Sequence, residues 1–154
     1  MPKTLIMGIG NLLMGDEGVG IHVLRCLREK SPPHGVEFVD GGTGGLNLLG
    51  FFLDYDRIIL IDAVADGQLS GTVSIVNPEY PSDYPATLVS HDIGLKDLID
   101  AAYLLERTPE IVMVTISIRE PTEVTLDLSP EVSAAIPAAA ATVLNELKSS
   151  QISS

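Results

Sequence analysis

The sequence predicts one α/β domain: a doubly wound, mostly parallel, five-stranded twisted sheet with helices on both faces and one antiparallel edge strand. Short apolar runs alternate with segments of helical periodicity, which is typical of parallel strands joined by crossover helices. The run RIILIDAV at 57–64 is apolar on both faces, as expected of a central strand. The run GTVSIVN at 71–77 follows it too closely for a crossover helix, which predicts the antiparallel edge strand.

The first half of the chain begins this alternation. KTLIMG at 3–8 is short, apolar and closed by glycine, which predicts a buried strand. From 17 to about 30, apolar residues recur at helical spacing until SPPHG interrupts the chain. VEFVD at 36–40 predicts a second strand, GLNLLGFFLD at 45–54 a short helix, and 57–64 the third strand.

The second half continues it after the edge strand. Residues 78–90 contain three prolines and predict a long surface loop, and loops of this length often carry function. Residues 93–106 predict a helix and 110–118 another central strand. Residues 129–148 predict a last helix, which Pro137 is expected to kink.

The length and composition suit a single domain with a substantial core. The chain has 154 residues, of which 45% are apolar, and we expect the domain to span 1–148 with a frayed tail at 149–154. The apolar runs are shorter than a membrane-spanning helix requires, and the N-terminus lacks the pattern of a signal peptide. We therefore expect a cytoplasmic protein, with a monomer as the default.

Charge and cysteine content exclude several classes of function. The formal net charge of −12 argues against nucleic acid or an anionic membrane as a partner, because both require basic patches. Cys26 is the only cysteine, so the chain has no internal disulfide and no thiolate cluster for zinc or iron–sulfur. Cys26 lies in a predicted helix, where packing is favoured over catalysis.

The glycine-rich segment MGIGNLLMGDEGVG at 7–20 follows the first strand, as phosphate-binding loops do. A dinucleotide fingerprint would need glycine at Leu13, and a P-loop would need lysine and a hydroxyl where Asp16 and Glu17 stand. Asp40 at the end of the second strand suits a ribose-binding acid, so a non-hydrolytic nucleotide-binding module stays an alternative. Helix capping is another interpretation of the two adjacent acids, although it does not explain the surrounding glycines.

Polar residues stand where strands end, at the sheet edge where doubly wound folds bind ligands. Glu17 follows the first strand, Asp62 ends the third, and His91 follows the proline-rich loop. Each has an ordinary alternative: Glu17 complements a helix dipole, Asp62 accepts backbone amides, and His91 is solvated or caps a helix. Together, two carboxylates and an imidazole suit a divalent metal with open coordination positions.

Such a metal site would support hydrolysis. A bound divalent metal polarises a carbonyl or lowers the pKa of a bound water to about 7. The sequence contains neither a G-x-S-x-G segment nor an H-E-x-x-H segment, which disfavours a serine hydrolase and an ordinary zincin.

Five segments occur in order along nearly the whole chain: GIGNLLMGDEGVG, DGGTGGLNLL, LIDAVADG, SHDIGLKDLI and LSPEV. In these segments the sequence closely resembles the hydrogenase maturation proteases, the endopeptidases that mature the large subunit of nickel–iron hydrogenases. The resemblance implies a small α/β endopeptidase, of aspartic or metal-dependent type, that acts on the large-subunit precursor. It removes a C-terminal extension after nickel has been inserted.

The resemblance also implies roles for particular residues. On the matching motifs, the family's metal-binding positions are Glu17, Asp62 and His91. In one version nickel is delivered by the substrate and recognised by these residues; in the other, the protein's own divalent metal activates water. Asp40 matches a recurrent acid of the family, and Asp16 and Asp40 are the candidates for the general base.

One segment departs from the family pattern. Where the family often has a turn of the GIQP or GIEP type, this chain has SIREP, in which Arg119 and Glu120 add charges near the sheet edge. This difference bears on how the substrate is seated. A further alternative shares the metal site: an assembly factor that senses metallation and releases the subunit uncut.

Overall fold

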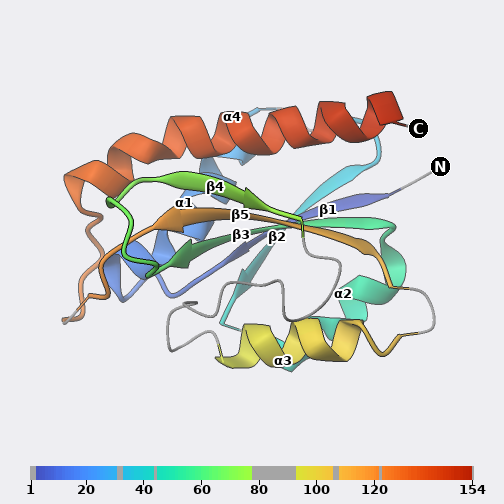
Figure 1. The fold of residues 1–154 in the computed structure, drawn as a ribbon, viewed down its shortest axis with the longest axis horizontal. Helices are drawn as coiled ribbons and strands as arrows, with labels where there is room; N and C mark the ends of the chain where they lie inside the picture. The colour runs from blue at the N-terminus through green and yellow to red at the C-terminus, as the bar shows by residue number, and fades with distance from the viewer. Residues whose placement is uncertain are drawn as a thin grey trace.

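Among the residues that the structure describes, a five-stranded sheet with the order β2-β1-β3-β5-β4 forms the middle layer (Figure 1). The structure is a computed structural model, and it describes residues 3–30, 33–43, 45–77, 93–105, 108–121 and 123–153. The strands are β1 (Thr4–Ile9), β2 (Val36–Gly42), β3 (Arg57–Val64), β4 (Val73–Val76) and β5 (Glu110–Ser117). The first three and β5 are parallel, and β4 runs antiparallel to β5, so the predicted fold class is confirmed.

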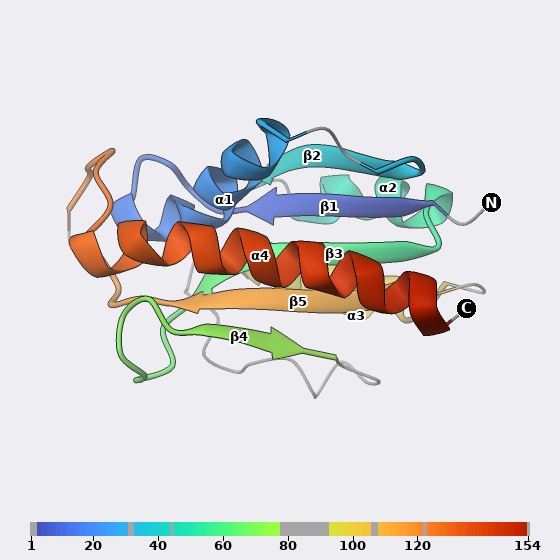
Figure 2. The ribbon, with the colours of Figure 1, turned by 90° about the horizontal axis from the view of Figure 1, so that it is seen from above.

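Helices cover both faces of the sheet. The helices are α1 (Val19–Arg28), α2 (Leu49–Asp54), α3 (Ile93–Ala102) and α4 (Pro130–Ser153), with short 3-10 helices η1 (Gly15–Gly18) and η2 (Gly45–Leu48). α1 and α4 lie on one face, and α2 and α3 lie on the other (Figures 1 and 2). No helix in the described part of the chain is long and apolar enough to cross a membrane.

β3 lies at the centre of the core, because every one of its residues is buried. Ile59 and Ile61 belong to the apolar cluster beneath α1 and α4, whereas Ile58 and Leu60 belong to the cluster beneath α2 and α3. Successive side chains of a strand point to opposite faces. Asp62, two residues after Leu60, therefore lies on the face covered by α2 and α3, near the carboxyl end of β3.

Two helices begin or end away from their predicted limits. The segment predicted as a helix from Glu17 opens with η1 and becomes α1 only at Val19. α3 ends at Ala102, four residues before its predicted end. After it, the N–H groups of Leu104 and Leu105 bond to carbonyls three residues back, a tighter turn than the α-helix allows.

α4 is longer than the sequence indicates. It continues to Ser153, past its predicted end at Lys148, and runs through Pro137 as one helix. The domain limit at Lys148 stays a prediction, and the predicted loop at 78–90 lies outside the described residues.

Candidate active site

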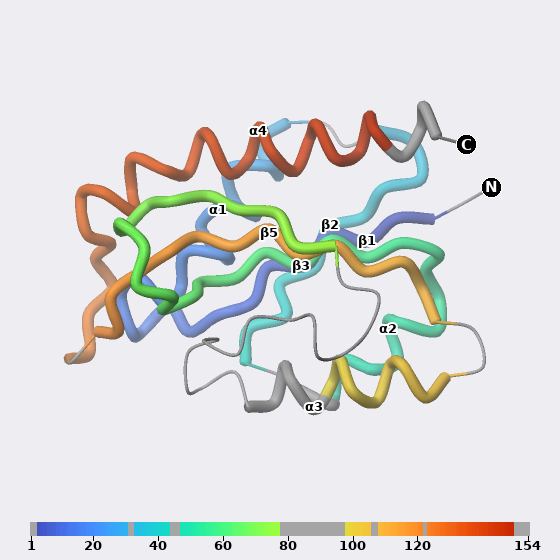
Figure 3. Tube along the Cα trace, viewed as in Figure 1, coloured from blue at the N-terminus to red at the C-terminus, as the bar shows by residue number. Residues whose placement is uncertain are grey.

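The carboxyl ends of β2, β1, β3 and β5 lie at one edge of the sheet, on the left in Figures 1 and 2. The segments that gather there include residues 10–14, 65–72, and 118–121 with 123–129. β1 begins and α4 ends at the opposite edge (Figure 3). Because doubly wound sheets bind ligands at their carboxyl edge, this edge is the expected place of the functional site.

Two glycines let the first loop fold tightly against the sheet. Gly10 has a φ of 146°, and a Cβ there would lie 2.2 Å from the carbonyl oxygen of Glu17. A Cβ at Gly20 would lie 2.3 Å from the carbonyl oxygen of Ile61. No side chain fits at either position, so the glycines bring the segment that carries Glu17 onto the strand that carries Asp62.

Glu17 and Asp62 are buried carboxylates at this edge, with exposed fractions of 3% and 0%. η1, which contains Glu17, packs against β3, which contains Asp62. Oδ1 of Asp62 accepts a hydrogen bond of 2.8 Å from the Ala63 N–H, so one of its oxygens has the backbone-amide role that the sequence left open. Burial of carboxylates is costly unless they are paired, hydrogen-bonded or bound to metal, and their oxygens suit a divalent cation.

The third predicted metal ligand, His91, lies outside the described residues. α3 begins two residues later, at the carboxyl edge and on the face of the sheet to which Asp62 belongs (Figure 1). The described residues contain no group of three His, Cys, Asp or Glu side chains placed to hold a metal ion. The set of Glu17, Asp62 and His91 therefore stays a prediction, of which the structure describes two members.

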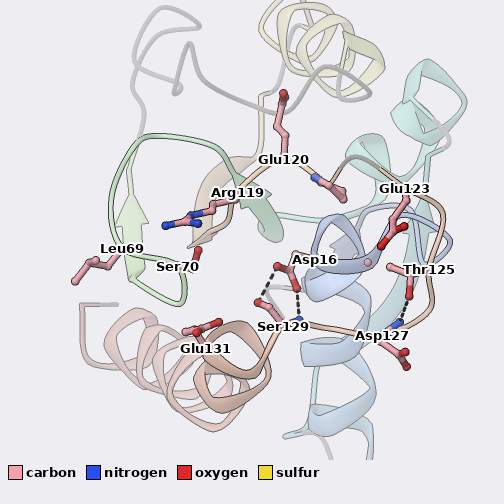
Figure 4. Close-up of a pocket in the computed structure, with 12 residues that line it drawn as sticks. Asp16, Leu69, Ser70, Arg119, Glu120, Glu123, Thr125, Asp127, Ser129 and Glu131 are labelled. Atoms are coloured by element: carbon pink, nitrogen blue, oxygen red, sulfur yellow. Dashed lines mark hydrogen bonds between the residues drawn. The ribbon is translucent and has the colours of Figure 1, made fainter.

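Asp16, one of the two candidate bases, binds the start of the last helix. Its Oδ1 accepts a hydrogen bond from the Ser129 N–H, and its Oδ2 accepts one from the Ser129 hydroxyl, both of 2.8 Å (Figure 4). It does not cap its own helix, because the residue before α1 is Gly18, which makes no side-chain capping bond. The alternative interpretation of Asp16 as a cap of the helix that follows it is thus wrong for α1; its carboxylate instead binds the residue that precedes α4.

Asp40, the other candidate base, is exposed at the same edge. It is in register with Gly8 of β1, which is in register with Ile61 of β3. Two strand spacings, roughly 10 Å, therefore separate the Cα atoms of Asp40 and Ile61. Oδ1 of Asp40 accepts a hydrogen bond of 2.9 Å from the Gly42 N–H.

A cavity of about 640 Å³ opens beside η1 (Figure 4). Asp16 and the segment after β5 line it, together with residues from the 65–72 segment and the first turn of α4. Arg119 and Glu120 both line the cavity and are exposed, as expected of charges added at this sheet edge. Glu17 and Asp62 do not line it; Asp16, the residue before Glu17 in η1, does.

Hydrogen bonds fix the 65–72 segment, which forms one wall of the cavity. The Gly71 N–H donates to the Ser117 carbonyl at 2.8 Å, and the backbone and side-chain amides of Gln68 donate to Asp66. Burial raises the pKa of the Asp66 carboxyl. Hydrogen bonds, chiefly those from the backbone and side-chain amides of Gln68, outweigh that effect and hold this pKa below its ordinary value of 3.8. The charged carboxylate therefore organises this turn at neutral pH.

Comparison with known proteins agrees with the fold and with the resemblance seen in the sequence. The family model described as hydrogenase maturation protease matches residues 21–146. The chain belongs to the hydrogenase maturation protease family. The Hydrogenase 2 maturation protease of Escherichia coli K12 is 31% identical over 153 residues, which are 97% of this chain and 93% of that protein.

Solved structures of family members share the fold. The hydrogenase maturating endopeptidase HybD of E. coli superposes with a TM-score of 0.86 at 30% identity, over 96% of this chain and 93% of that one. The [NiFe] hydrogenase maturation protease HybD of Thermococcus kodakarensis has a TM-score of 0.74 at 30% identity, over 94% and 98% of the two chains. Family membership makes this chain a hydrolase of the protease class.

Two features of the site were missed in the sequence: Ser129 as the partner of Asp16, and the cavity lined by the segment after β5. The signal for Ser129 was present, because Ser-Pro-Glu is a typical helix start with serine at the N-cap and proline at the first helical position. The sequence contains no comparable signal for the cavity, which forms only where four separate segments meet.

Proposed function

We propose that this chain is the endopeptidase that removes a C-terminal extension from the large-subunit precursor of a nickel–iron hydrogenase after nickel insertion. Family membership and the names of its relatives, which refer to hydrogenase maturation, support the proposal. The observation that carries it is the burial of Glu17 and Asp62 at the carboxyl edge of the sheet. Oxygen donors held in this way suit recognition of a divalent metal.

In this proposal nickel belongs to the substrate. Glu17, Asp62 and His91 provide three donors, and a divalent ion bound by three protein groups keeps open positions for other ligands. Donors from the precursor fill those positions, so the complete coordination shell forms only with nickel-loaded substrate. Such a site makes cleavage depend on metallation.

The proposal assigns proton transfer to Asp40 rather than to Asp16. A general base has to approach the attacking water, at about 2.6–3.2 Å or through one further water. Both oxygens of Asp16 already accept hydrogen bonds from Ser129, whereas Asp40 is exposed and accepts a hydrogen bond from Gly42 through Oδ1. Asp40 is therefore free to hold water beside the scissile carbonyl, and Asp16 acts as a positioning residue.

The test is cleavage of purified large-subunit precursor, loaded with nickel or free of it, followed by mass spectrometry of the products. The variants are His91→Ala and Asp62→Asn, and matched controls are His34→Ala and Glu29→Gln, both at exposed positions away from the carboxyl edge. We expect wild type and the controls to shorten only the nickel-loaded precursor. The two site variants should leave that precursor intact, although their cooperative thermal unfolding shows that they are folded.

Two results would overturn parts of the proposal. Equal cleavage of nickel-loaded and nickel-free precursor would refute nickel recognition. It would still support the proposal that the chain is a protease acting on this precursor. Binding of the loaded precursor without any shortening would refute cleavage and support an assembly factor that senses metallation.

A further inference from the structure

We infer that the cavity beside η1, together with exposed apolar side chains around it, is a docking surface for the polypeptide substrate. It accepts an extended segment that carries both basic and apolar side chains. This inference rests on the proposed function for the identity of the substrate and extends it to the recognition of the polypeptide rather than of the metal.

The charges of the cavity favour a cationic occupant. Among its lining residues are four exposed acids, namely Glu120, Glu123, Asp127 and Glu131. None of the four forms an ion pair with a residue that the structure describes, although Arg119 lines the same cavity. Figure 4 shows these side chains at separate points around the cavity, where they outnumber Arg119 and give the surface a negative charge that attracts basic side chains.

Apolar side chains at the same edge form a second and independent feature, which we call the apolar rim. It consists of Leu13, Leu69, Val124 and Leu126, with exposed fractions of 57%, 87%, 75% and 67%. Leu69 lines the cavity, whereas Leu13, Val124 and Leu126 lie outside its lining, the last two on either side of the lining residue Thr125 in the sequence. Exposed large apolar side chains around a polar cavity are typical of interaction sites. The rim thus indicates that the occupant also carries apolar groups, as a polypeptide does and a small cation does not.

Backbone hydrogen bonds join the segment that carries Leu13 to the segment that carries Val124 and Leu126. The Thr125 N–H donates to the Leu13 carbonyl at 2.9 Å, and the Gly15 N–H donates to the Thr125 carbonyl at 2.8 Å. Met14 and Thr125 also form a parallel β-bridge. Because this surface is already ordered, binding a substrate segment there requires little rearrangement of the enzyme.

The position of the surface relates it to the proposed reaction. Asp16 lines the cavity and precedes Glu17 in η1, so a segment seated in the cavity contacts the 3-10 helix that carries Glu17. A cavity of about 640 Å³ also accommodates more than one side chain. The surface would therefore hold the precursor while the metal-bearing part reaches Glu17 and Asp62.

The first test measures binding of labelled synthetic peptides by fluorescence anisotropy. The probes are a hexapeptide of alternating Leu and Arg, and its counterpart with Glu in place of Arg. We expect the Arg peptide to bind and the Glu peptide not to. The double variant E120Q/E123Q should weaken binding by about fivefold, whereas E29Q/D100N, which removes the same charge from exposed positions elsewhere, should change it by less than about twofold.

The apolar rim has a closely matched control. Leu126→Ser removes a rim side chain that is 67% exposed, and Leu53→Ser removes one that is 66% exposed on α2, outside the cavity lining. We expect Leu126→Ser to weaken binding of the Leu-Arg peptide by about threefold or more, and Leu53→Ser to leave it unchanged.

The second test uses the precursor and separates this inference from the proposed function. If wild type cleaves the precursor, E120Q/E123Q should raise KM and leave kcat unchanged, because these residues bind substrate and do not react. Unchanged KM, or equal binding of the Arg and Glu peptides, would refute the docking surface while cleavage by wild type stands. Failure of wild type to cleave would refute the proposed function, and the peptide measurements would still decide on the docking surface.

Discussion

The carboxylate of Asp16 accepts two hydrogen bonds from Ser129, a residue 113 positions later in the chain, one from its N–H and one from its hydroxyl. This pair joins η1, which carries Glu17, to the residue immediately before α4. The N–H groups at the start of a helix have no partner within the helix, and a carboxylate satisfies them well. Asp16 therefore stabilises the start of α4 and fixes the position of the neighbouring residue Glu17, a predicted metal ligand.

We predict that Asp16→Ala lowers the free energy of unfolding by about 2 kcal/mol, because it removes both bonds and leaves the Ser129 donors without an acceptor. Ser129→Ala removes the hydroxyl bond alone and should cost about 1 kcal/mol. Urea denaturation measures both. Asp127→Asn, at an exposed carboxylate on the same segment, is the control and should change stability by less than about 0.5 kcal/mol.

Activity of Asp16→Asn distinguishes positioning from catalysis. The amide oxygen still accepts a bond from Ser129, so a positioning role predicts partial activity in this variant and less in Asp16→Ala. A general base would lose its function equally in both. Complete loss of cleavage by a well-folded Asp16→Asn enzyme would therefore contradict the positioning role and return Asp16 to the catalytic group.

The pairing of Asp16 with Ser129 also marks the limit of what the sequence predicts. The order of strands and helices could be predicted because it depends on local periodicity, as in the uniformly apolar strand β3. The carboxyl edge of that sheet then indicated where Glu17 and Asp62 lie. Ser-Pro-Glu marks Ser129 as a helix start, but its pairing with Asp16 could not be predicted, because no local pattern relates residues 113 positions apart. The cavity likewise depends on how distant segments meet.

Gly20 provides a prediction about the tight contact between α1 and the sheet. A Cβ there would lie 2.3 Å from the carbonyl oxygen of Ile61, a backbone atom that cannot move aside. Gly20→Ala should therefore destabilise the fold by about 2 kcal/mol, as overpacking does, and displace η1 from β3. Gly50→Ala in α2 is the matched control. No atom lies within 4 Å of a Cβ there, and alanine should stabilise the helix by about 0.5–1 kcal/mol.

Thermal or urea denaturation of the two alanine variants checks this contrast. Gly20→Ala should also weaken cleavage of the precursor, since Glu17 and Asp62 lie on the elements that the extra methyl pushes apart. Equal stability of the Gly20→Ala and Gly50→Ala variants would show that α1 does not need this close approach.

Tyr55 provides a prediction about alkaline pH. Its hydroxyl donates a hydrogen bond to the Glu37 carboxylate. This bond, with burial and the charges of Glu37 and Asp54, raises the pKa of Tyr55 from 10.0 to about 12. The unfolded chain loses this proton near pH 10, whereas the folded protein keeps it. The contribution of this hydrogen bond to the free energy of unfolding is therefore complete below pH 10, and it declines as the pH rises toward 12.

The ultraviolet absorbance of tyrosinate follows this titration directly. One tyrosine should titrate late, near pH 12, and Tyr55→Phe should abolish that late phase. Glu37→Gln keeps the tyrosine and removes the charge, so it should move the late phase toward pH 10. A late phase that persists in Tyr55→Phe would mean that another tyrosine is responsible.

Arg57, at the start of β3, joins the sheet to α4 far from the carboxyl edge. Its side chain is buried, and its Nη1 and Nη2 donate to the carbonyl and the carboxylate of Glu146, both at 2.8 Å. Arg57→Met should cost about 3 kcal/mol, because it leaves a largely buried carboxylate without its partner. The control is Glu110→Gln: Glu110 is a largely exposed partner of Arg57 at 3.4 Å, and its loss should cost less than about 1 kcal/mol.

The double variant R57M/E146M tests whether the stability lost in Arg57→Met comes from the unpaired charge of the Glu146 carboxylate. When both charged groups are replaced by apolar side chains of similar volume, a buried pair is often dispensable. The double variant should therefore recover most of the stability that Arg57→Met loses, in urea denaturation at the same pH. If it is no more stable than Arg57→Met, the contribution of Arg57 lies in its hydrogen bond to the Glu146 carbonyl. Cleavage by the folded variants should equal that of wild type, since Arg57 lies at the edge opposite the candidate site.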